Sequence, residues 1–355
     1  MLEQIVYCPI LHTRQAEIKA LIQLPLVSKQ KIFPLIVARP WPNAKGMVRT
    51  WEKVAEAFGA YNFALDLDTS RYDQGTGKAA SDEFRLLFNP ANGFSNYYDA
   101  IAALPRAVPV LRLNGGSIPE IDKQATHVDL MDRGVVCRLQ YMPGVPVGMV
   151  VREIIHRFPD LTIFVDTGWS PDLLMREAWA SQIIQQITDE KPETEIVVTG
   201  SSFPDTFSDI GARGIRDLKE RTLFANLMRR HNAATLVYGD WGSTRPTPEP
   251  SVMRITPRID LPTRANWIFF RQDKSLATPE SYADIAKRTM DDANWPRSLA
   301  IWGTYTIECT AQDVPGGIRS PAAAAAARVN IHLHQQAFYS ADDVVSDSDE
   351  PYTDD

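Results

Sequence analysis

The stretch Ile5–Leu24, IVYCPILHTRQAEIKALIQL, decides how the rest of the chain is interpreted. Its first half is a short apolar run that predicts a β-strand, and its second half places apolar residues at helical spacing. A polar corner separates the two halves, and Pro25 ends the helical pattern. The stretch therefore predicts one β/α unit, and the same pattern recurs, with variations, through the first two-thirds of the chain.

Further short apolar runs predict seven more strands, with helical segments between them. One expected helix starts at Ser170 and runs to about Asp189, and another covers Arg216–His231. Eight such units predict a single TIM-type (β/α)8 barrel, with an open doubly wound sheet as the alternative. No GxGxxG follows the first strand, which weakens the dinucleotide-binding form of the open sheet. The seven strands are Lys31–Ala38, Tyr61–Leu67, Val108–Leu113, Val135–Leu139, Leu161–Val165, Glu195–Thr199 and Thr235–Tyr238.

The last third of the chain departs from this repeat. Arg245–Pro262 holds five prolines and predicts an excursion that forms a hairpin with Asn266–Phe270. Tyr282–Met290 and Pro321–Tyr339 predict helices, the second because it contains a run of alanines. We therefore expect one barrel domain over residues 1–339, with an insertion at about 241–278 as its C-terminal elaboration. Ser340–Asp355 contains seven Asp or Glu and predicts a disordered acidic tail.

Composition limits the class of protein. The 355 residues are 44% apolar and 23% charged, which is typical of a globular chain. A net charge of -7 argues against general nucleic-acid binding and against binding to anionic membranes. The sequence has no long apolar run, no secretory leader and no CxxC pair, so it predicts no membrane span, no disulfide framework and no cysteine zinc site. A cytoplasmic location is expected.

Charged residues fall on one face of three consecutive predicted strands. Side chains alternate along a strand, so Asp66, Arg112 and Arg138 lie opposite the more apolar faces. In a barrel they would lie inside at a similar height, where Val, Ile or Leu usually fill the lumen, and we expect them to be close together. One carboxylate against two guanidinium groups leaves positive charge, which favours an anionic ligand or another acid. The alternative is a buried salt-bridge network that only sets the register of the strands.

Other polar residues follow the strand ends, where barrel enzymes place their active sites. Asp68 and Asp166 could form a metal pair or a general acid/base pair, or could serve as helix caps. With His12 they are the candidate catalytic residues, and no catalytic role is assigned beyond that. The candidate ligand-binding residues are Asp66, Arg112, Arg138, Gln140, Ser201 and Asp240.

Two strand ends, Thr199–Ser202 and Gly239–Ser243, are rich in small residues. Small residues let backbone N–H groups approach a phosphate, and barrels often bind phosphate at these strands, although Gly-Ser is also ordinary loop composition. No HExxH, GxSxG or P-loop motif occurs. His332 and His334 point about 200° apart on a helix, so they are not a metal clip. The sequence thus predicts no metal site and leaves any cofactor unidentified.

The opening strand and helix resemble the phage (T-even type) beta-protein family. In that family a Tyr-x-Pro-x-Leu strand precedes a basic residue and a Glu at the start of the first helix, and a Pro-Leu-Ile strand follows. The late helix ARVNIHLHQQ is similar to the closing segment of the family, so the likeness spans about Tyr7 to Phe338. Val37 stands where an acidic residue is expected. The matching residues are Tyr7, Pro9, Leu11, Arg14, Glu17, Pro34, Leu35, Ile36, Arg328, Asn330 and His332.

The resemblance implies a phage or mobile-element setting and no established activity. Two hypotheses about function follow. In the first, the protein is an enzyme or sensor that binds an anionic, phosphate-like or nucleotide-like small molecule at the barrel mouth. In the second, it is a scaffold with a protein partner in phage defence or counter-defence, and the charges inside the barrel are structural.

Overall fold

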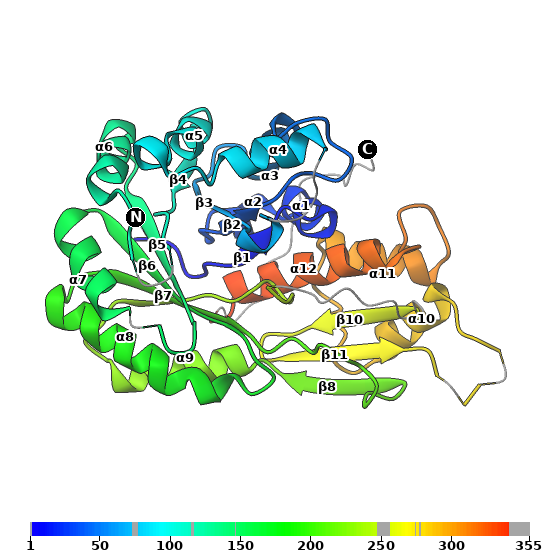
Figure 1. Cartoon of the computed structure of the whole chain (residues 1–355). Coiled ribbons are helices and arrows are strands. Elements are labelled where there is room, and N and C mark those ends of the chain that lie inside the picture. Colours follow the sequence, from blue (N-terminus) through cyan, green and yellow to red (C-terminus); the bar gives the residue numbers. More distant parts are fainter. Residues whose placement is uncertain are drawn as a thin grey trace. The chain divides into compact units, whose positions relative to one another are not determined.

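A computed structural model describes residues 2–72, 77–114, 117–145, 147–246, 256–273, 275–276 and 278–340 (Figure 1). The chain divides into two compact units, each assembled from separate segments. Unit 1 comprises Met1–Thr13, Ile32–Ser202 and Lys219–Trp241, and unit 2 comprises Arg14–Lys31, Phe203–Leu218 and the chain from Gly242 onward. Apart from Ser340, the predicted acidic tail lies outside the described residues, as do residues 247–255, 274 and 277 of the predicted insertion.

Unit 1 contains two parallel sheets of four strands each, in the orders β1-β2-β3-β4 and β5-β6-β7-β9. All eight strands predicted from the sequence are confirmed, with boundaries shifted by a few residues. They are short and mostly buried, as expected for parallel strands covered by helices. Their bounds are Ile10–His12 (β1), Leu35–Ala38 (β2), Phe63–Leu67 (β3), Ala107–Pro109 (β4), Val135–Gln140 (β5), Leu161–Trp169 (β6), Glu195–Ser201 (β7) and Leu236–Tyr238 (β9).

Helices connect these strands, and Figure 1 shows α7, α8 and α9 along the outer side of β5–β7. Their faces follow helical spacing: in α3, Thr50, Val54, Ala57 and Phe58 are buried and the residues between them are more exposed. The bounds are Val48–Phe58 (α3), Ala79–Leu86 (α4), Ala91–Ala102 (α5), Ile121–Met131 (α6), Gly148–Arg157 (α7), Glu177–Glu190 (α8) and Lys219–Arg230 (α9), with 3-10 turns at Thr69–Arg71 (η1) and Leu173–Arg176 (η2).

The two sheets of unit 1 meet at two seams. One isolated parallel bridge joins Val110 to Val136, and another joins Tyr7 to Tyr238. Backbone hydrogen bonds accompany them, from Leu111 N to Val136 O at 2.8 Å and from Cys8 N to Tyr238 O at 2.9 Å. Isolated bridges are not strand-length ladders, so the structure shows an α/β protein with two parallel sheets and does not show a closed barrel.

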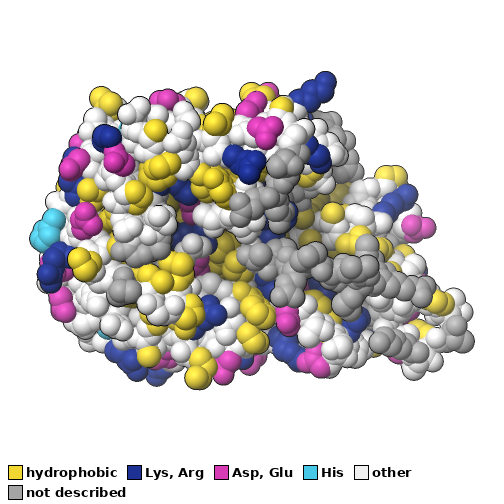
Figure 2. Space-filling model, in the orientation of Figure 1, with side chains coloured by type: hydrophobic (Ala, Val, Ile, Leu, Met, Phe, Trp, Pro, Cys, Tyr) yellow, Lys and Arg dark blue, Asp and Glu magenta, His cyan; other side chains and the backbone are white. Residues whose placement is uncertain are grey.

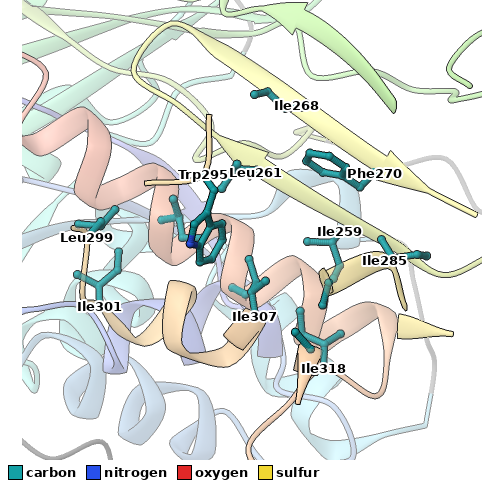
Figure 3. Close-up of a cluster of buried hydrophobic side chains, with 14 of the residues drawn as sticks. Ile259, Leu261, Ile268, Phe270, Ile285, Trp295, Leu299, Ile301, Ile307 and Ile318 are labelled. Atoms are coloured by element: carbon teal, nitrogen blue, oxygen red, sulfur yellow. The ribbon is translucent and has the colours of Figure 1, made fainter. Parts of the chain in front are cut away.

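Unit 2 is built on a small antiparallel sheet with the order β10-β11-β8. The predicted hairpin between the proline-rich excursion and Asn266–Phe270 is confirmed as β10 and β11. Its inner face and the helices bury the apolar cluster shown in Figure 3, which includes Leu261, Phe270 and Ile307. The bounds are Arg213–Asp217 (β8), Arg258–Pro262 (β10), Asn266–Arg271 (β11), Gln15–Ile22 (α1), Leu26–Lys29 (α2), Tyr282–Asp291 (α10), Trp302–Ala311 (α11) and Pro321–Ala337 (α12).

The structure differs from the expectation at strand β8 and at helix α11. The predicted helix at Arg216–His231 starts only at Lys219, because residues up to Asp217 belong to strand β8. Helix α11 was not predicted, because its buried residues lie all around it and leave no amphipathic pattern.

Basic and acidic side chains are interspersed over the face of the molecule seen in Figure 2. None of the described helices combines the length and apolar character needed to cross a membrane.

Helix α12 holds unit 2 together through a buried amide. Asn330 Nδ2 donates to the backbone oxygens of Ala20 and Gln23 at 3.0 Å each, and its Oδ1 accepts from Gly303 N at 2.9 Å. A Cβ atom on Gly303 would lie 2.8 Å from Ala327 O, so α11 and α12 can approach this closely only with glycine there. The late helix that resembles the closing segment of the family is therefore buried, and its Asn330 links α12 to α1 and α11.

Candidate functional site

The inward faces of four strand segments in unit 1 change from apolar to charged over two residues. Ala64, Val110, Val136 and Phe164 belong to one buried apolar cluster to which all eight parallel strand segments contribute. Residues i and i+2 share a face of a strand, so a charged residue follows each of these four toward the carboxyl end. We call these four charged residues the polar layer; they are Asp66, Arg112, Arg138 and Asp166.

Ion pairs join the polar layer into a chain. Arg112 Nη1 lies 2.5 Å from Asp66 Oδ1, and Arg138 Nη1 lies 3.0 Å from Asp66 Oδ2. Arg138 also donates to Asp166 Oδ2, from Nη2 at 2.8 Å and from Nε at 3.1 Å. The prediction that Asp66, Arg112 and Arg138 lie close together is confirmed. The second acid, which the charge count allowed for as an alternative to a ligand, is Asp166, so two carboxylates face two guanidinium groups.

Trp241, which follows β9, completes this arrangement and was not singled out from the sequence. Its Nε1 donates to Asp166 Oδ1 at 3.1 Å, and the Arg138 guanidinium lies 4.9 Å from its ring centroid. The His12 ring lies 5.3 Å from the same indole. The available signal was its position at the predicted strand end Gly239–Ser243.

Burial and the neighbouring carboxylates shift the pKa of Arg138 in opposite directions. Burial alone would lower the pKa of its guanidinium, but the carboxylates of Asp166 and Asp66 outweigh burial and raise the pKa above its ordinary value. Arg138 is 7% exposed and Asp166 is 1% exposed. The carboxylates of the polar layer therefore keep Arg138 positively charged although it is shielded from bulk water.

Aromatic rings flank the side chain of Arg112, and Gln124 fixes its backbone. Its guanidinium carbon lies 5.4 Å from the Phe88 ring centroid and 5.3 Å from that of Tyr97. Gln124 binds the backbone N–H and C=O of Arg112, at 2.9 and 3.0 Å. The buried Nε of Arg112 has no hydrogen-bond acceptor among the described residues. One donor of a fixed guanidinium is therefore unsatisfied.

The other candidate catalytic residues form a second cluster. Asp68 Oδ2 lies 2.9 Å from Arg39 Nη2 and 3.7 Å from His12 Nε2. Asp68 Oδ1 accepts from Ser70 N at 3.1 Å and so caps η1, which is one of the three roles considered for it. Asp166 lies inside β6 and is not a helix cap; its Oδ1 accepts from Gly168 N at 2.9 Å, where the register of β6 against β7 shifts. Within the described ranges, no group of three or more His, Cys, Asp or Glu side chains is arranged to hold a metal ion.

The remaining ligand-binding candidates have different surroundings, and Gln140 is the ladder partner of Asp166 in the β5–β6 pair. Gln140 is exposed at the end of β5, on the face that carries Arg138. Asp240 accepts from Tyr7 Oη at 2.5 Å and from Tyr238 Oη at 2.8 Å. Burial, followed by the Asp240 charge, raises the pKa of both tyrosines well above the ordinary value. Ser201 is buried, and its carbonyl accepts from Ser170 N at 2.9 Å.

The small-residue corner after β7 already binds a carboxyl group of the protein. Ser202 donates its backbone N–H to Glu220 Oε1, and its hydroxyl to Glu220 Oε2 at 2.9 Å. Burial raises the pKa of Glu220 to about 7. The sequence predicts a phosphate site here, but both hydrogen-bond donors of Ser202 are already bound by the carboxyl group of Glu220, in the first turn of α9. Glu220 was missed because nothing in the sequence indicates that it folds back onto this corner.

The fold and the polar layer define a class of protein: parallel β/α units whose strands end in an internally paired charged layer. Comparison with known proteins gives the family. The chain belongs to the Beta protein family, whose model matches residues 7–338.

One relative is "Protein beta" of Enterobacteria phage P4, which is 27% identical over 341 residues. The matched region covers 93% of this chain and 92% of the relative. The relative comes from phage P4, whereas the resemblance suggests a T-even source for the family name. The similarity extends over nearly the whole of both chains, so it includes both units.

Proposed function

We propose that the polar layer binds a small anionic ligand, phosphate-like or nucleotide-like, at the carboxyl ends of the parallel strands. The observation that carries this proposal is the unsatisfied Nε of Arg112, whose side chain is only 6% exposed. A buried donor without an acceptor costs about 1–3 kcal/mol. An oxygen of an anionic ligand would satisfy this donor and face a guanidinium that is already oriented.

The surroundings of Arg112 suit such a ligand. Arginine recognises phosphate and carboxylate groups through its fork of donors, and rings on its faces hold the fork in place at little further cost in entropy. One face of β5 runs from buried Val136 through Arg138 to exposed Gln140. Exposure to solvent thus increases along this face from the polar layer to the end of the strand, so a ligand that enters from solvent would meet Gln140 first.

Ligand-induced thermal stabilisation of the full chain tests the proposal. Inorganic phosphate and a nucleoside monophosphate are added separately, and the melting temperature of wild type should rise with the logarithm of ligand concentration once this exceeds the dissociation constant. Arg112→Gln should abolish the rise. Arg106→Gln is the matched control, because Arg106 is exposed and immediately precedes β4, whereas Arg112 follows β4, and this variant should respond like wild type.

Arg112→Gln also breaks the ion pair with Asp66 and lowers stability by itself. The double variant Asp66→Asn/Arg112→Gln removes both charges, so it separates loss of binding from loss of folding. A folded double variant that is still stabilised by phosphate as wild type is would contradict the proposal.

A scaffold with a protein partner is the second candidate function, and the charge balance of the polar layer favours it. Two acids and two arginines pair with one another, which leaves no excess charge to attract an anion. An unbiased mass-spectrometric screen of metabolites on the purified protein separates the two functions. Recovery of a small anion by wild type and not by Arg112→Gln supports the ligand site, and recovery of none supports the scaffold.

We also infer that the two parallel sheets form one TIM-type barrel. The bridges at both seams and the apolar cluster shared by all eight strand segments support this inference. Hydrogen exchange tests it: the amides of Cys8 and Leu111, which donate across the seams, should be as protected as Leu35 within a sheet. Fast exchange at either seam would mean that the sheets remain open there.

A further inference from the structure

Strand β8 of unit 2 has an open edge. In the antiparallel sheet it pairs with β11 on one side only, and no described strand pairs with its other side (Figure 1). Backbone hydrogen bonds run from Arg271 N to Ala212 O at 2.9 Å and from Leu218 N to Ala265 O at 2.8 Å. Hydrogen-bonded pairs alternate in an antiparallel ladder, so Ala212, Gly214, Arg216 and Leu218 face β11.

The intervening residues direct their backbone groups to the open edge. These are Arg213, Ile215 and Asp217, and all three side chains are exposed. Ile215 is 42% exposed, yet it lies directly opposite Ile268 of β11, which is 2% exposed and part of the core of unit 2. The apolar face of the sheet therefore extends from Ile268 in β11 to Ile215 in β8, and the side chain of Ile215 is exposed at the edge.

The order of side chains along β8 is self-complementary. Arg213 and Asp217 lie at equal distances in sequence on either side of Ile215. In an antiparallel pair centred on Ile215, each Arg213 would face Asp217 of the other strand, and the two Ile215 side chains would face each other. The residues that would exchange hydrogen bonds are the same ones whose backbone groups point outward.

We propose that β8 is the interface through which two copies of this chain associate, with the strands antiparallel and Ile215 on the two-fold axis. The symmetry of the charges favours a second copy over an unrelated peptide, because an identical strand supplies both oppositely charged partners at this spacing. Pairing would join two three-stranded sheets into one sheet of six strands.

Two arginines have to move for this pairing: Arg213, which is paired with Asp292 at 2.6 Å, and Arg216. Arg216 Nη1 donates to the outward carbonyl of Ile215 at 2.9 Å, and Nη2 donates to Asp209 Oδ2 at 2.5 Å. In the proposed register Arg216 lies opposite Gly214 of the second copy, which has no side chain to obstruct it. A contact of five residues that must displace two arginines is small, so association is reversible and depends on protein concentration.

Sedimentation of the full chain over a concentration series tests the proposal. Wild type should shift from one copy toward two as concentration rises. Asp217→Arg and Arg213→Glu should each remain a single copy, because each places like charges opposite one another twice. An equimolar mixture of these two variants should recover the association, because both cross-strand pairs are then of opposite charge.

Controls distinguish pairing from damage to the fold. Arg213 also pairs with Asp292 at 2.6 Å, so circular dichroism must show that Arg213→Glu is folded. Ile215→Asp is a second variant, with two carboxylates at the centre, and should also remain a single copy. Leu130→Asp on α6, where the leucine is 80% exposed, is its control and should associate like wild type. A wild type that stays a single copy at every concentration, or folded edge variants that associate as wild type does, would overturn the proposal.

Discussion

Two buried carboxylates, Asp66 in unit 1 and Asp260 in unit 2, each hold two arginines. Asp66 binds Arg112 and Arg138, at 2.5 and 3.0 Å. Asp260 binds Arg258 and Arg328, both at 2.6 Å. The difference lies in what the arginines do next: Arg138 continues to a second carboxylate, Asp166, whereas no such second ion pair joins Arg328 to a further acid among the described residues.

The charge state of the arginines reflects this difference. Burial lowers the pKa of Arg328. Asp260 and, to a smaller extent, Glu17 raise it, but together they do not offset burial and the neighbouring Arg258. For Arg138, two carboxylates more than offset burial and the pKa is raised. The comparison indicates that direct ion pairs with two carboxylates hold a buried arginine as a cation better than one such ion pair does.

The largest expected effect follows from removing the shared acid. Asp66→Asn leaves Arg112 without its carboxylate, and Asp260→Asn leaves two arginines without one. Each should lower the free energy of unfolding by about 3–5 kcal/mol, with Asp260→Asn at the upper end. Chemical denaturation measures this, with the exposed Asp189→Asn as control. A loss below about 1 kcal/mol for either variant would be inconsistent with a structural charge at that position.

Glu220 extends the comparison to a buried acid that has hydrogen bonds from Ser202 in place of arginines. Burial raises its pKa from 4.5 to about 7, so the folded protein holds a proton that the unfolded chain releases. This contribution to stability is complete below about pH 4.5 and is lost as pH rises through about 7. Wild type should lose on the order of 3 kcal/mol over this range relative to Glu220→Gln. Parallel pH profiles of denaturation for the two proteins would rule the shift out.

A double-mutant cycle measures how strongly the polar layer is coupled. Asp66→Asn/Arg138→Gln removes one charge of each sign, and it should be less destabilised than the sum of the single variants by about 0.5–3 kcal/mol. Asp260→Asn/Arg328→Gln provides the corresponding cycle in unit 2. Strict additivity in unit 1 would show that the 3.0 Å contact between Arg138 and Asp66 contributes no coupling energy.

The smallest expected effect concerns an ion pair in water. Arg49 and Glu52 on α3 are 51% and 56% exposed and lie 2.9 Å apart. Arg49→Ala should cost about 0.5 kcal/mol or less, because water screens the pair. The difference should disappear at about 1 M salt, where the Debye length is about 3 Å. A larger effect that persists in salt would remove the contrast between surface pairs and the polar layer.

Periodicity in the sequence predicts unit 1 better than unit 2. Parallel strands are short apolar runs separated by helices, so all eight could be located, and alternation placed Asp66, Arg112 and Arg138 on one face. The pairing of Arg138 with Asp166 could not be predicted, because Asp166 follows the predicted strand Leu161–Val165, where a turn explains it equally well, whereas β6 continues to Trp169. The assembly of each unit from distant segments has no local signature at all.

Elements without a one-sided pattern were missed. Strand β8 was partly assigned to the following helix, because both its edge and one of its faces are exposed and no apolar alternation marks it. The role of Trp241 depends on contacts with three separate strand segments, which periodicity does not encode. Whether the polar layer binds an anion is likewise a question of charges brought together by folding, and it stays a prediction.

The amide of Asn330 also has a consequence for synthesis of the chain. It binds the end of α1 across 310 positions of sequence. At about 5–20 residues per second, a ribosome needs roughly 15–60 s to make the chain between them. Helix α1 leaves the ribosome early, with Ile18 and Leu21 destined for burial, and its partner α12 is among the last helices to appear. Strands of unit 1 can pair during this interval, whereas unit 2 can be completed only after α12 has been translated.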